Sequence, residues 1–594
     1  MREGQLYALV EKVRAGQLSR RVFTERMVAF GLTAPLAAQM LMHSGFALAQ
    51  AASEYKPIKR GGGGALRLLW WQAPTLLNPH FGTGEKDLDG ARIFYEPLAT
   101  WAADGTLVPV LAAGIPSLDN GDVTPDGRSV TWRLKRGVQW HDGRPFTADD
   151  CIFNWEYARN PDTSALTIGT YRDVTVVKVD DFTVRVEFKQ PTPFWAGAFV
   201  NLSVIPKHLF ANFVGARSRD APANLRPVGT GPYRFVSFKP GDELRGELNP
   251  EYHLPNRPFF DTIEMKGGGD AVSAARAVIQ SGEFDFAWNT QVEDEVLRRM
   301  ESGGRGRAVI TAGGATEFIL LNQADPWSEV DGERASPKSR HPILTDPVVR
   351  QAFNHLVDRK SIQEHIYGRT GIATANFLNN PERVNSKNLT WEFSIDRANA
   401  LLDASGWTRA SDGIRAKDGR KLKFLFQTST NALRQKTQAI IKQAAQRAGI
   451  ELELKAITPS VYFSSDVANT ETNTKFFADI QMFALNRANP DPGRFMELFC
   501  SWEMAARDNK WQGRNLARWR SDDYDRAFRA AQTELDPVKR SALFIRLNDL
   551  VCTSNAVIPI VYRPDVSAVS NRLHAPLSGW SSNLWRLQEW YKDA

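Results

Sequence analysis

The sequence predicts an α/β protein with more than one domain. The chain has 594 residues, too many for a single hydrophobic core, so two or three domains are expected. A strand pattern over Lys421–Gln427 precedes a helical pattern over Asn431–Ala448 and a second strand pattern over Ile450–Ile457. This order is typical of parallel strands joined by a crossover helix. Helices expected over Asp346–Val357 and Ser521–Glu534 extend the same α/β unit.

The strand–helix–strand unit also indicates where a ligand would bind. Residues Thr428–Asn431 follow the first strand and lie at its carboxyl end. Open α/β sheets bind ligands just outside the carboxyl ends of their strands. We therefore expect this turn to face a binding cleft.

The first 49 residues have the features of an export signal. Ser19–Phe23 has the form of a twin-arginine motif, and the modestly apolar stretch Met27–Met42 follows it. The triplet Ala47–Ala49 then provides a signal-peptidase site before Gln50. A soluble amphipathic helix or a membrane anchor is the alternative, but the apolar run is shorter than the ~20 residues that a spanning helix needs. We expect a cleaved signal over 1–49 and a periplasmic mature protein.

Glycine and short strands characterise the next part of the chain. Gly61–Gly64 predicts that residues 50–64 form a flexible tether, with the structured domain beginning near Ala65. A helix is expected over 148–159, with Thr147 as its N-cap. Alternating patterns predict strands over Ala65–Trp71, Ser129–Leu134, Val174–Val179 and Thr183–Phe188.

Three cysteines are present in a chain expected to reach an oxidising compartment. Cys151 begins an apolar helical pattern and is expected to be a small buried hydrophobe. Cys500 and Cys552 remain, and we consider a disulfide between them and two free thiols about equally well supported.

The charge of the chain gives no indication of a nucleic-acid partner. The formal net charge is +7, from 74 basic and 67 acidic residues. A small excess spread over so long a chain is the ordinary composition of a mixed-charge solvated surface. No nucleic-acid partner is expected.

A series of short blocks occurs in a fixed order along the chain. The most distinctive is Trp132–Val138 followed by His141–Asp150. Together the blocks resemble the family 5 extracellular solute-binding proteins, which include the oligopeptide and dipeptide binders of ABC importers. The other blocks are Tyr95–Leu98, Gly229–Tyr233, Asn249–Tyr252, Gly282–Asp285 and Asp346–Ala352.

The resemblance implies a two-lobe periplasmic binding protein fold of type 2, with an extra subdomain in lobe one and the ligand cleft between the lobes. We expect lobe one over 65–318, its subdomain over about 95–220, lobe two over 319–558, and a return to lobe one over 559–594. It also implies a peptide or small-molecule ligand, the permease subunits of an ABC importer as partners, contact with the inner membrane only through that importer, a monomer, and no cofactor.

One departure from the family pattern concerns the ligand. Peptide-binding members have a Trp-x-x-Asp segment whose aspartate pairs with the free α-amino group of the peptide. The matching segment here places Leu485 at the tryptophan and Ala488 at the aspartate, although Asp491-Pro492 is retained. A buried ammonium needs an acceptor, which alanine does not provide. Either another acidic residue replaces it, with Arg487 facing solvent, or the ligand differs from a free-amine peptide. It would then be a peptide with a blocked or differently placed amine, an opine, a sugar conjugate or another anion.

Aromatic and amide residues supply the remaining ligand-binding candidates. Trp70 and Trp71 are consecutive in a strand, so their rings point to opposite faces and only one can line a cleft. The full set of candidates is Trp70, Trp71, Trp288, Asn289, Asn376, Phe377, Leu485, Asn486, Arg487, Ala488 and Asn489.

No catalytic or metal site is predicted. The chain has no Walker loop, no Gly-x-Ser-x-Gly elbow and no His-Glu-x-x-His helix, and its nine histidines lack metal-ligand spacing. His141-Asp142-Gly143 is interpreted as a turn before a capped helix, and Gly229–Tyr233 as glycine needed for special backbone angles. A periplasmic chaperone or a ligand sensor on the same fold is the alternative to a transport protein.

Overall fold

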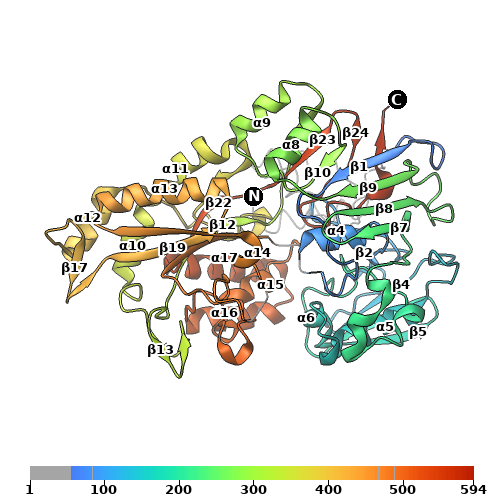
Figure 1. The fold of residues 1–594 in the computed structure, drawn as a ribbon. Helices are drawn as coiled ribbons and strands as arrows, with labels where there is room; N and C mark the ends of the chain where they lie inside the picture. Colours follow the sequence, from blue (N-terminus) through green and yellow to red (C-terminus); the bar gives the residue numbers. More distant parts are fainter. Residues whose placement is uncertain (1–54, 83, 465–467, 487–488, 594) are drawn as a thin grey trace, which may run out of the picture.

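The computed structural model describes residues 55–593 apart from residue 83, residues 465–467 and residues 487–488. It consists of two lobes, each built on a mixed sheet (Figure 1). The predicted signal peptide lies outside the described residues. No helix in the described part of the chain combines the length and the apolar character required to span a membrane.

Lobe one contains a seven-stranded sheet in the order β11-β23-β10-β1-β9-β8-β7. β1 pairs in parallel with both β9 and β10, whereas the other pairs are antiparallel. The strands are β1 (Ala65–Leu69), β7 (Tyr233–Lys239), β8 (Glu243–Leu248), β9 (Thr262–Lys266), β10 (Phe286–Ala287), β11 (Gly306–Thr311) and β23 (Asp565–Ser570).

Alternation along β1 separates two cores of lobe one. Leu66 and Leu68 contribute to the large core that continues into the subdomain, whereas Leu69 packs against α8 (Ala271–Ile279) on the other face. α9 (Asp294–Glu301) also lies on that second face through buried Leu297. Successive side chains of a strand point to opposite faces, so one short strand can serve both cores.

The subdomain of lobe one carries its own three-stranded sheet in the order β4-β6-β5. α5 (Ala148–Arg159) packs beside it, and the backbone N–H of its N-cap residue Thr147 donates to Asp150 at 3.1 Å. The predicted helix 148–159 is therefore confirmed. The strands are β2 (Ala99–Trp101), β3 (Leu107–Pro109), β4 (Ser129–Arg133), β5 (Val174–Asp180) and β6 (Thr183–Phe188).

Lobe two contains a six-stranded sheet in the order β15-β22-β12-β21-β19-β20. β19 and β20 are parallel and are connected by α13 (Ala432–Arg447), as the sequence predicts. The strands are β12 (Thr316–Leu321), β15 (Ile372–Ala373), β19 (Lys423–Ser429), β20 (Glu451–Ile457), β21 (Ile480–Leu485) and β22 (Val557–Tyr562).

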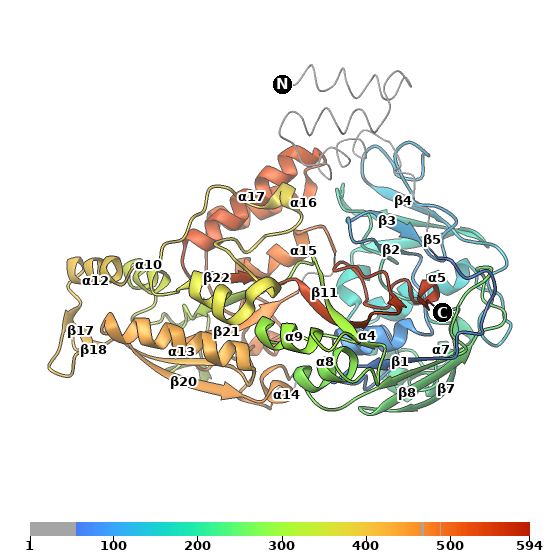
Figure 2. The ribbon, with the colours of Figure 1, turned by 90° about the horizontal axis from the view of Figure 1, so that it is seen from above.

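Helices cover both faces of the lobe-two sheet (Figures 1 and 2). In β12, Ile319 and Leu321 face one core, and Phe318 and Leu320 face the other. The first core contains α10 (Pro347–His355), α12 (Ile395–Ala404) and α13, and the second contains α16 (Asp522–Thr533) and α17 (Pro537–Thr553).

The chain crosses between the two sheets twice. β11 of lobe one leads into β12 of lobe two, and β22 of lobe two leads back into β23 of lobe one. The crossings therefore lie in residues 312–315 and 563–564. The boundaries expected at 318 and 558 each fall within a strand of lobe two and need correction by a few residues, because the sequence alone gives no sheet membership.

The glycine run is fixed to lobe one, so the prediction of a flexible tether is wrong for Gly61–Gly64. All four backbone N–H groups donate hydrogen bonds of 2.8–3.1 Å to the segment 258–261. A Cβ on Gly63 would collide with the ring of Phe259. Glycine is needed here because two backbone segments approach closely, rather than for flexibility.

His141 has a structural environment, in agreement with its interpretation as part of a turn. Its Nδ1 accepts from the N–H of Gly229 at 3.1 Å, and its Nε2 donates to the carbonyl of Gly231 at 3.0 Å. Burial lowers the pKa of His141 to about 4. A Cβ on Gly229 would collide with the carbonyl of Phe94. These blocks of the chain hold the subdomain on lobe one.

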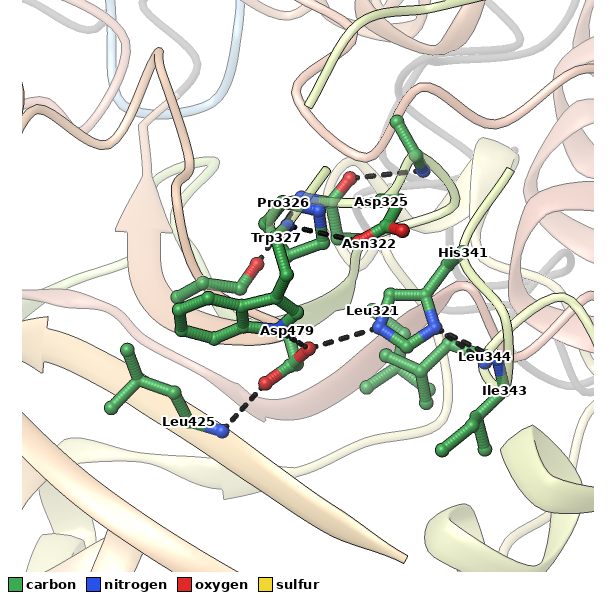
Figure 3. A network of polar contacts seen from close by, with 12 residues as sticks. Leu321, Asn322, Asp325, Pro326, Trp327, His341, Ile343, Leu344, Leu425 and Asp479 are labelled. Carbon is green, nitrogen blue, oxygen red and sulfur yellow. Dashed lines mark hydrogen bonds and ion pairs between the residues drawn. The ribbon is translucent and has the colours of Figure 1, made fainter. Parts of the chain in front are cut away.

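A polar network fixes the loop after β12 to the lobe-two sheet (Figure 3). The Oδ1 of buried Asp479 accepts from Trp327 Nε1 at 2.7 Å and from His341 Nε2 at 3.0 Å, and its Oδ2 accepts from the N–H of Leu425 in β19 at 2.7 Å. The Nδ1 of His341 accepts from two backbone N–H groups of its own loop. One carboxylate therefore joins an exposed loop to the sheet.

All three cysteines are free and buried, so of the two alternatives for Cys500 and Cys552 the structure has the two free thiols. Both residues belong to the same core of lobe two, and Cys552 Sγ donates to Asn548 Oδ1 at 3.8 Å. Burial raises the pKa of the Cys552 thiol to about 12. Cys151 is fully buried in the core of lobe one, as expected.

Candidate functional site

A cavity of about 550 Å³ lies between the two lobes. Lobe one contributes Trp71 and Gln72 after β1, the beginning of α4 (Glu85–Arg92) and of α8, the segment 288–293 and the beginning of β23. Lobe two contributes Ser429–Arg434, Pro459, Phe463, Ala484 and Asn486. Cavities of this size between domains commonly bind small ligands.

The lobe-two wall lies at the carboxyl end of β19. Ser429 ends that strand, Thr430 and Asn431 follow, and α13 begins at Ala432. Asn431 caps the helix by accepting from the N–H of Arg434 at 3.1 Å. The position expected from strand order therefore faces the cavity, except that Thr428 is buried in the sheet.

The lobe-one wall has an aromatic surface. The rings of Trp71 and Trp288 stack with centroids 6.3 Å apart, and both residues line the cavity. Trp71 Nε1 donates to the carbonyl of Asn289 at 3.2 Å, and Trp288 Nε1 donates to Glu85 at 3.3 Å. Of the predicted residues, Trp71, Trp288 and Asn289 therefore meet at one wall.

Trp70 points away from the cavity, as the alternation of the strand requires. It is fully buried, its ring stacks on Phe286 at 5.4 Å, and its Nε1 donates to Asp89 at 3.1 Å. It thus supports the wall from behind and does not face a ligand.

Asn376 and Phe377 do not line the cavity, so their prediction as ligand-binding residues needs correction. Asn376 accepts from Asn548 Nδ2 at 2.7 Å, deep in lobe two. Phe377 packs between Phe318 and Phe495 in the same core. Asn376 and Phe377 both contact Asn548, and they therefore attach their own segment of lobe two to α17.

Of the described residues in the segment 485–489, Asn486 lines the cavity. Asn486 donates from lobe two to Glu85 of lobe one at 2.6 Å. Leu485 packs against the lobe-two core, and Asn489 accepts from the N–H of Asp491 at 3.1 Å, so these two predicted residues do not line the cavity. Arg487 and Ala488 lie outside the described residues, and their roles stay predictions.

The two cations on the cavity wall share a buried carboxylate. Arg434 Nε lies 2.6 Å from Glu317 Oε1, and Arg563 Nη1 lies 3.3 Å from Glu317 Oε2. Glu317 is 1% exposed and does not line the cavity. Both arginines on this wall are therefore ion-paired with Glu317, which is buried behind the cavity surface.

Two acidic side chains of lobe one near the cavity, Asp89 and Asp565, have raised pKa values. Burial, and then the charge of Glu85, raise the pKa of Asp89 to about 7 and that of Asp565 to about 8. Arg563 opposes the shift of Asp565. Carboxylates that lose solvent near a like charge favour the protonated form. A smaller cavity of about 80 Å³, lined by Asp89, adjoins the first and shares Glu85 and Asn486 with it.

Ion pairs join the lobes across their interface. Lys436 of α13 in lobe two pairs with Glu293 of lobe one at 2.7 Å. Arg369 of lobe two pairs with Asp294 and Glu301 of α9 in lobe one at 2.7 and 2.6 Å. Together with Asn486 and Glu85, these contacts hold the cavity closed between its two walls.

A second cavity, of about 530 Å³, belongs to lobe two alone. Its buried Arg359 donates to the carbonyls of Thr374 and Pro559 and to the side chain of Asn354, at 2.7–3.1 Å. These bonds tie β22 to its neighbours. The cavity between the lobes is the better ligand site because both lobes contribute to it.

Sequence reasoning missed Glu85, Asp89, Asp565 and the pair formed by Arg434 and Glu317. None of them belongs to a recognisable motif. Glu85 and Asp565 are separated by most of the chain and meet only because β23 returns to the sheet that contains β1. The sequence carried only a weak signal for Asp565, namely that it follows the segment in which the chain crosses back to lobe one.

Comparisons with known proteins identify the relatives of the chain. Residues 106–505 match the family described as bacterial extracellular solute-binding proteins, family 5 (middle). The oligopeptide-binding protein AppA of Bacillus subtilis is 27% identical over 393 residues, which are 65% of this chain and 67% of that protein. The glutathione-binding protein GsiB of Pectobacterium atrosepticum is 25% identical over 384 residues, 64% of this chain and 67% of that protein.

Solved structures have the same two-lobe fold. NikZ from Campylobacter jejuni, in complex with Ni(L-His), superposes with a TM-score of 0.74 at 21% identity, covering 89% of this chain and 99% of NikZ. AppA from Bacillus subtilis, in complex with a nonapeptide, gives a TM-score of 0.73 at 21% identity, covering 91% of this chain and all of AppA. The expected two-lobe binding-protein fold is confirmed.

Proposed function

We propose that this chain, which belongs to family 5 of the bacterial extracellular solute-binding proteins, captures a peptide or peptide-like small solute and delivers it to an ABC importer. The observation that carries the proposal is the cavity between the lobes, whose walls come from both sheets. Two connecting segments between such lobes allow hinge closure around a ligand. The names of AppA and GsiB as binding proteins for an oligopeptide and for glutathione support a peptide-like solute.

The proposal includes the cellular setting of the protein. The twin-arginine motif and the cleavage triplet before Gln50 support export to the periplasm. There the chain acts as a monomer that contacts the permease subunits of its importer, and it reaches the inner membrane only through them. Its role is to bind the solute, and no catalytic step is assigned to it.

Binding and closure are tested on the mature protein in solution. Isothermal titration calorimetry with pools of di- to nonapeptides should detect ligands, and small-angle X-ray scattering should show a smaller radius of gyration in their presence. Trp71→Ala should weaken binding at least tenfold, because buried aromatic side chains dominate many binding sites. Trp502→Ala is the matched control, since Trp502 is exposed and lies outside the cavity.

Two results would argue against this function. If Trp71→Ala and Trp502→Ala weaken peptide binding equally, the peptide binds elsewhere on the molecule. Suppression of the aggregation of unfolded client proteins, without binding of any solute, would indicate a chaperone instead.

A further inference from the structure

Apart from Asp270, which caps α8, three carboxylates of lobe one lie at the cleft or at the smaller cavity beside it without a cationic partner of their own. They are Glu85, Asp89 and Asp565, and none forms an ion pair with a lysine or arginine in the described part of the chain. The charges of all three influence one another, because Glu85 and Asp89 both disfavour ionisation of Asp565. Like charges held together in a partly dry site are costly unless a cation joins them.

The hydrogen bonds of these carboxylates leave acceptor capacity toward the cavity. Asp89 is well satisfied by Trp70, Ser582 and Asn583. Glu85 accepts one bond at each oxygen, although each oxygen has two lone pairs. Asp565 lines the cavity, and its carboxyl oxygens accept no hydrogen bond from the residues described.

No lysine or arginine of the described residues forms an ion pair with Glu85 or Asp565, although the charge of Arg563 acts on Asp565. Arg434 and Arg563 are held by Glu317, as described above. Lys436 is held by Glu293. The charge of Glu85 is therefore left for a ligand, and a cation bound beside it would favour the ionised form of Asp565.

The aromatic rings beside the carboxylates favour an organic cation. Trp71 and Trp288 line the same wall, and the indole of Trp288 contacts Glu85 directly. Ammonium and guanidinium groups are attracted to tryptophan faces as well as to carboxylates. A metal ion fits less well, because no three His, Cys, Asp or Glu side chains among the described residues are arranged to hold one.

We propose that Glu85 and Asp565 bind the positively charged group of an organic ligand, an ammonium or a guanidinium, against Trp71 and Trp288. This inference rests on the proposed function, because it names the chemistry of the solute in the same cleft. It also assigns an acceptor for a free amine in a chain that has alanine at position 488. Asn486, two residues before that position, already contacts Glu85.

The test uses calorimetric titration of the mature protein with matched probes. The peptide probes are tri-alanine and N-acetyl-tri-alanine, and the non-peptide cations are agmatine and spermidine. The variants are Glu85→Gln and Asp565→Asn. Their controls are Glu247→Gln and Asp104→Asn, which remove exposed lobe-one carboxylates outside the cavity. Circular dichroism verifies that each variant is folded.

We expect a cationic probe to bind, and acetylation of tri-alanine to weaken its binding at least tenfold. Glu85→Gln and Asp565→Asn should each weaken cation binding at least tenfold, whereas the two control variants should change it less than twofold. Binding of agmatine or spermidine alone, lost in Asp565→Asn, would support this inference and contradict the peptide function. Equal binding of both tri-alanine forms by all variants would support the peptide function and overturn the inference. Failure of every cationic probe to bind the folded protein would also overturn it.

Discussion

At the scale of single residues, Asp565 lies in an environment that disfavours its ionised form. Burial and the charges of Glu85 and Asp89 raise its pKa to about 8. Functional sites often retain such unfavourable charges at the expense of stability. Keeping this carboxyl group buried therefore costs folding free energy at any pH at which an unfolded aspartate is ionised.

We predict that Asp565→Asn stabilises the ligand-free protein by about 1–3 kcal/mol near pH 8. The folded-state pKa lies above the unfolded value, so ionisation costs folding free energy as the pH rises from about 4, and the full cost is present above about 8. The gain should therefore shrink toward zero at pH 4. Urea unfolding at pH 4, 6 and 8 measures it, and a gain that is independent of pH would contradict the electrostatic origin.

At the scale of elements, the strand–helix–strand unit was predictable to within about two residues. The expected Lys421–Gln427 and Asn431–Ala448 became β19 and α13, since periodicity and capping residues are local signals. Trp71 and Trp288 line the cavity as expected, because aromatic residues next to strand ends are visible in the sequence, and their contact with a ligand stays a prediction. The expectation that Asn376 and Phe377 line the cleft was wrong, because their burial against α17 is a tertiary contact that no local sequence pattern encodes.

Asp479 gives a test of how one side chain joins a loop to a sheet. Asp479→Ala removes the acceptor of Trp327, His341 and the N–H of Leu425, and should lower the free energy of unfolding by about 2–4 kcal/mol. Asp479→Asn keeps one acceptor oxygen and should lose less. Chemical denaturation measures both. Equal stability of Asp479→Ala and the unmodified protein would show that water replaces the carboxylate.

At the scale of the whole molecule, charged side chains at the lobe interface bias the position of the lobes. Lys436 and Glu293 approach each other only when α13 lies beside lobe one. The Lys436 side chain is 54% exposed, so its ion pair is expected to contribute less than about 1 kcal/mol and to weaken with salt.

We predict that Lys436→Ala lowers ligand affinity two- to fivefold at low salt, by disfavouring the closed arrangement. The difference should vanish near 1 M salt, where the Debye length is about 3 Å. Lys442→Ala, on the same helix and without an ion pair in the described structure, is the control. Calorimetric titration at two salt concentrations measures the effect, and an unchanged loss at high salt would point to lost packing instead.

The central place of β23 in lobe one has a consequence for how the chain is made. β23 lies between β11 and β10, yet it comes from near the end of the sequence. While the ribosome is still translating lobe two, the lobe that was synthesised first has a gap in its sheet, with the edges of β10 and β11 unpaired. Unpaired strand edges invite association with other chains. Lobe one is therefore started first but completed last, when β23 has been synthesised. A chain released from the ribosome before β23 is made has an incomplete lobe-one sheet, which only the absent β23 would complete.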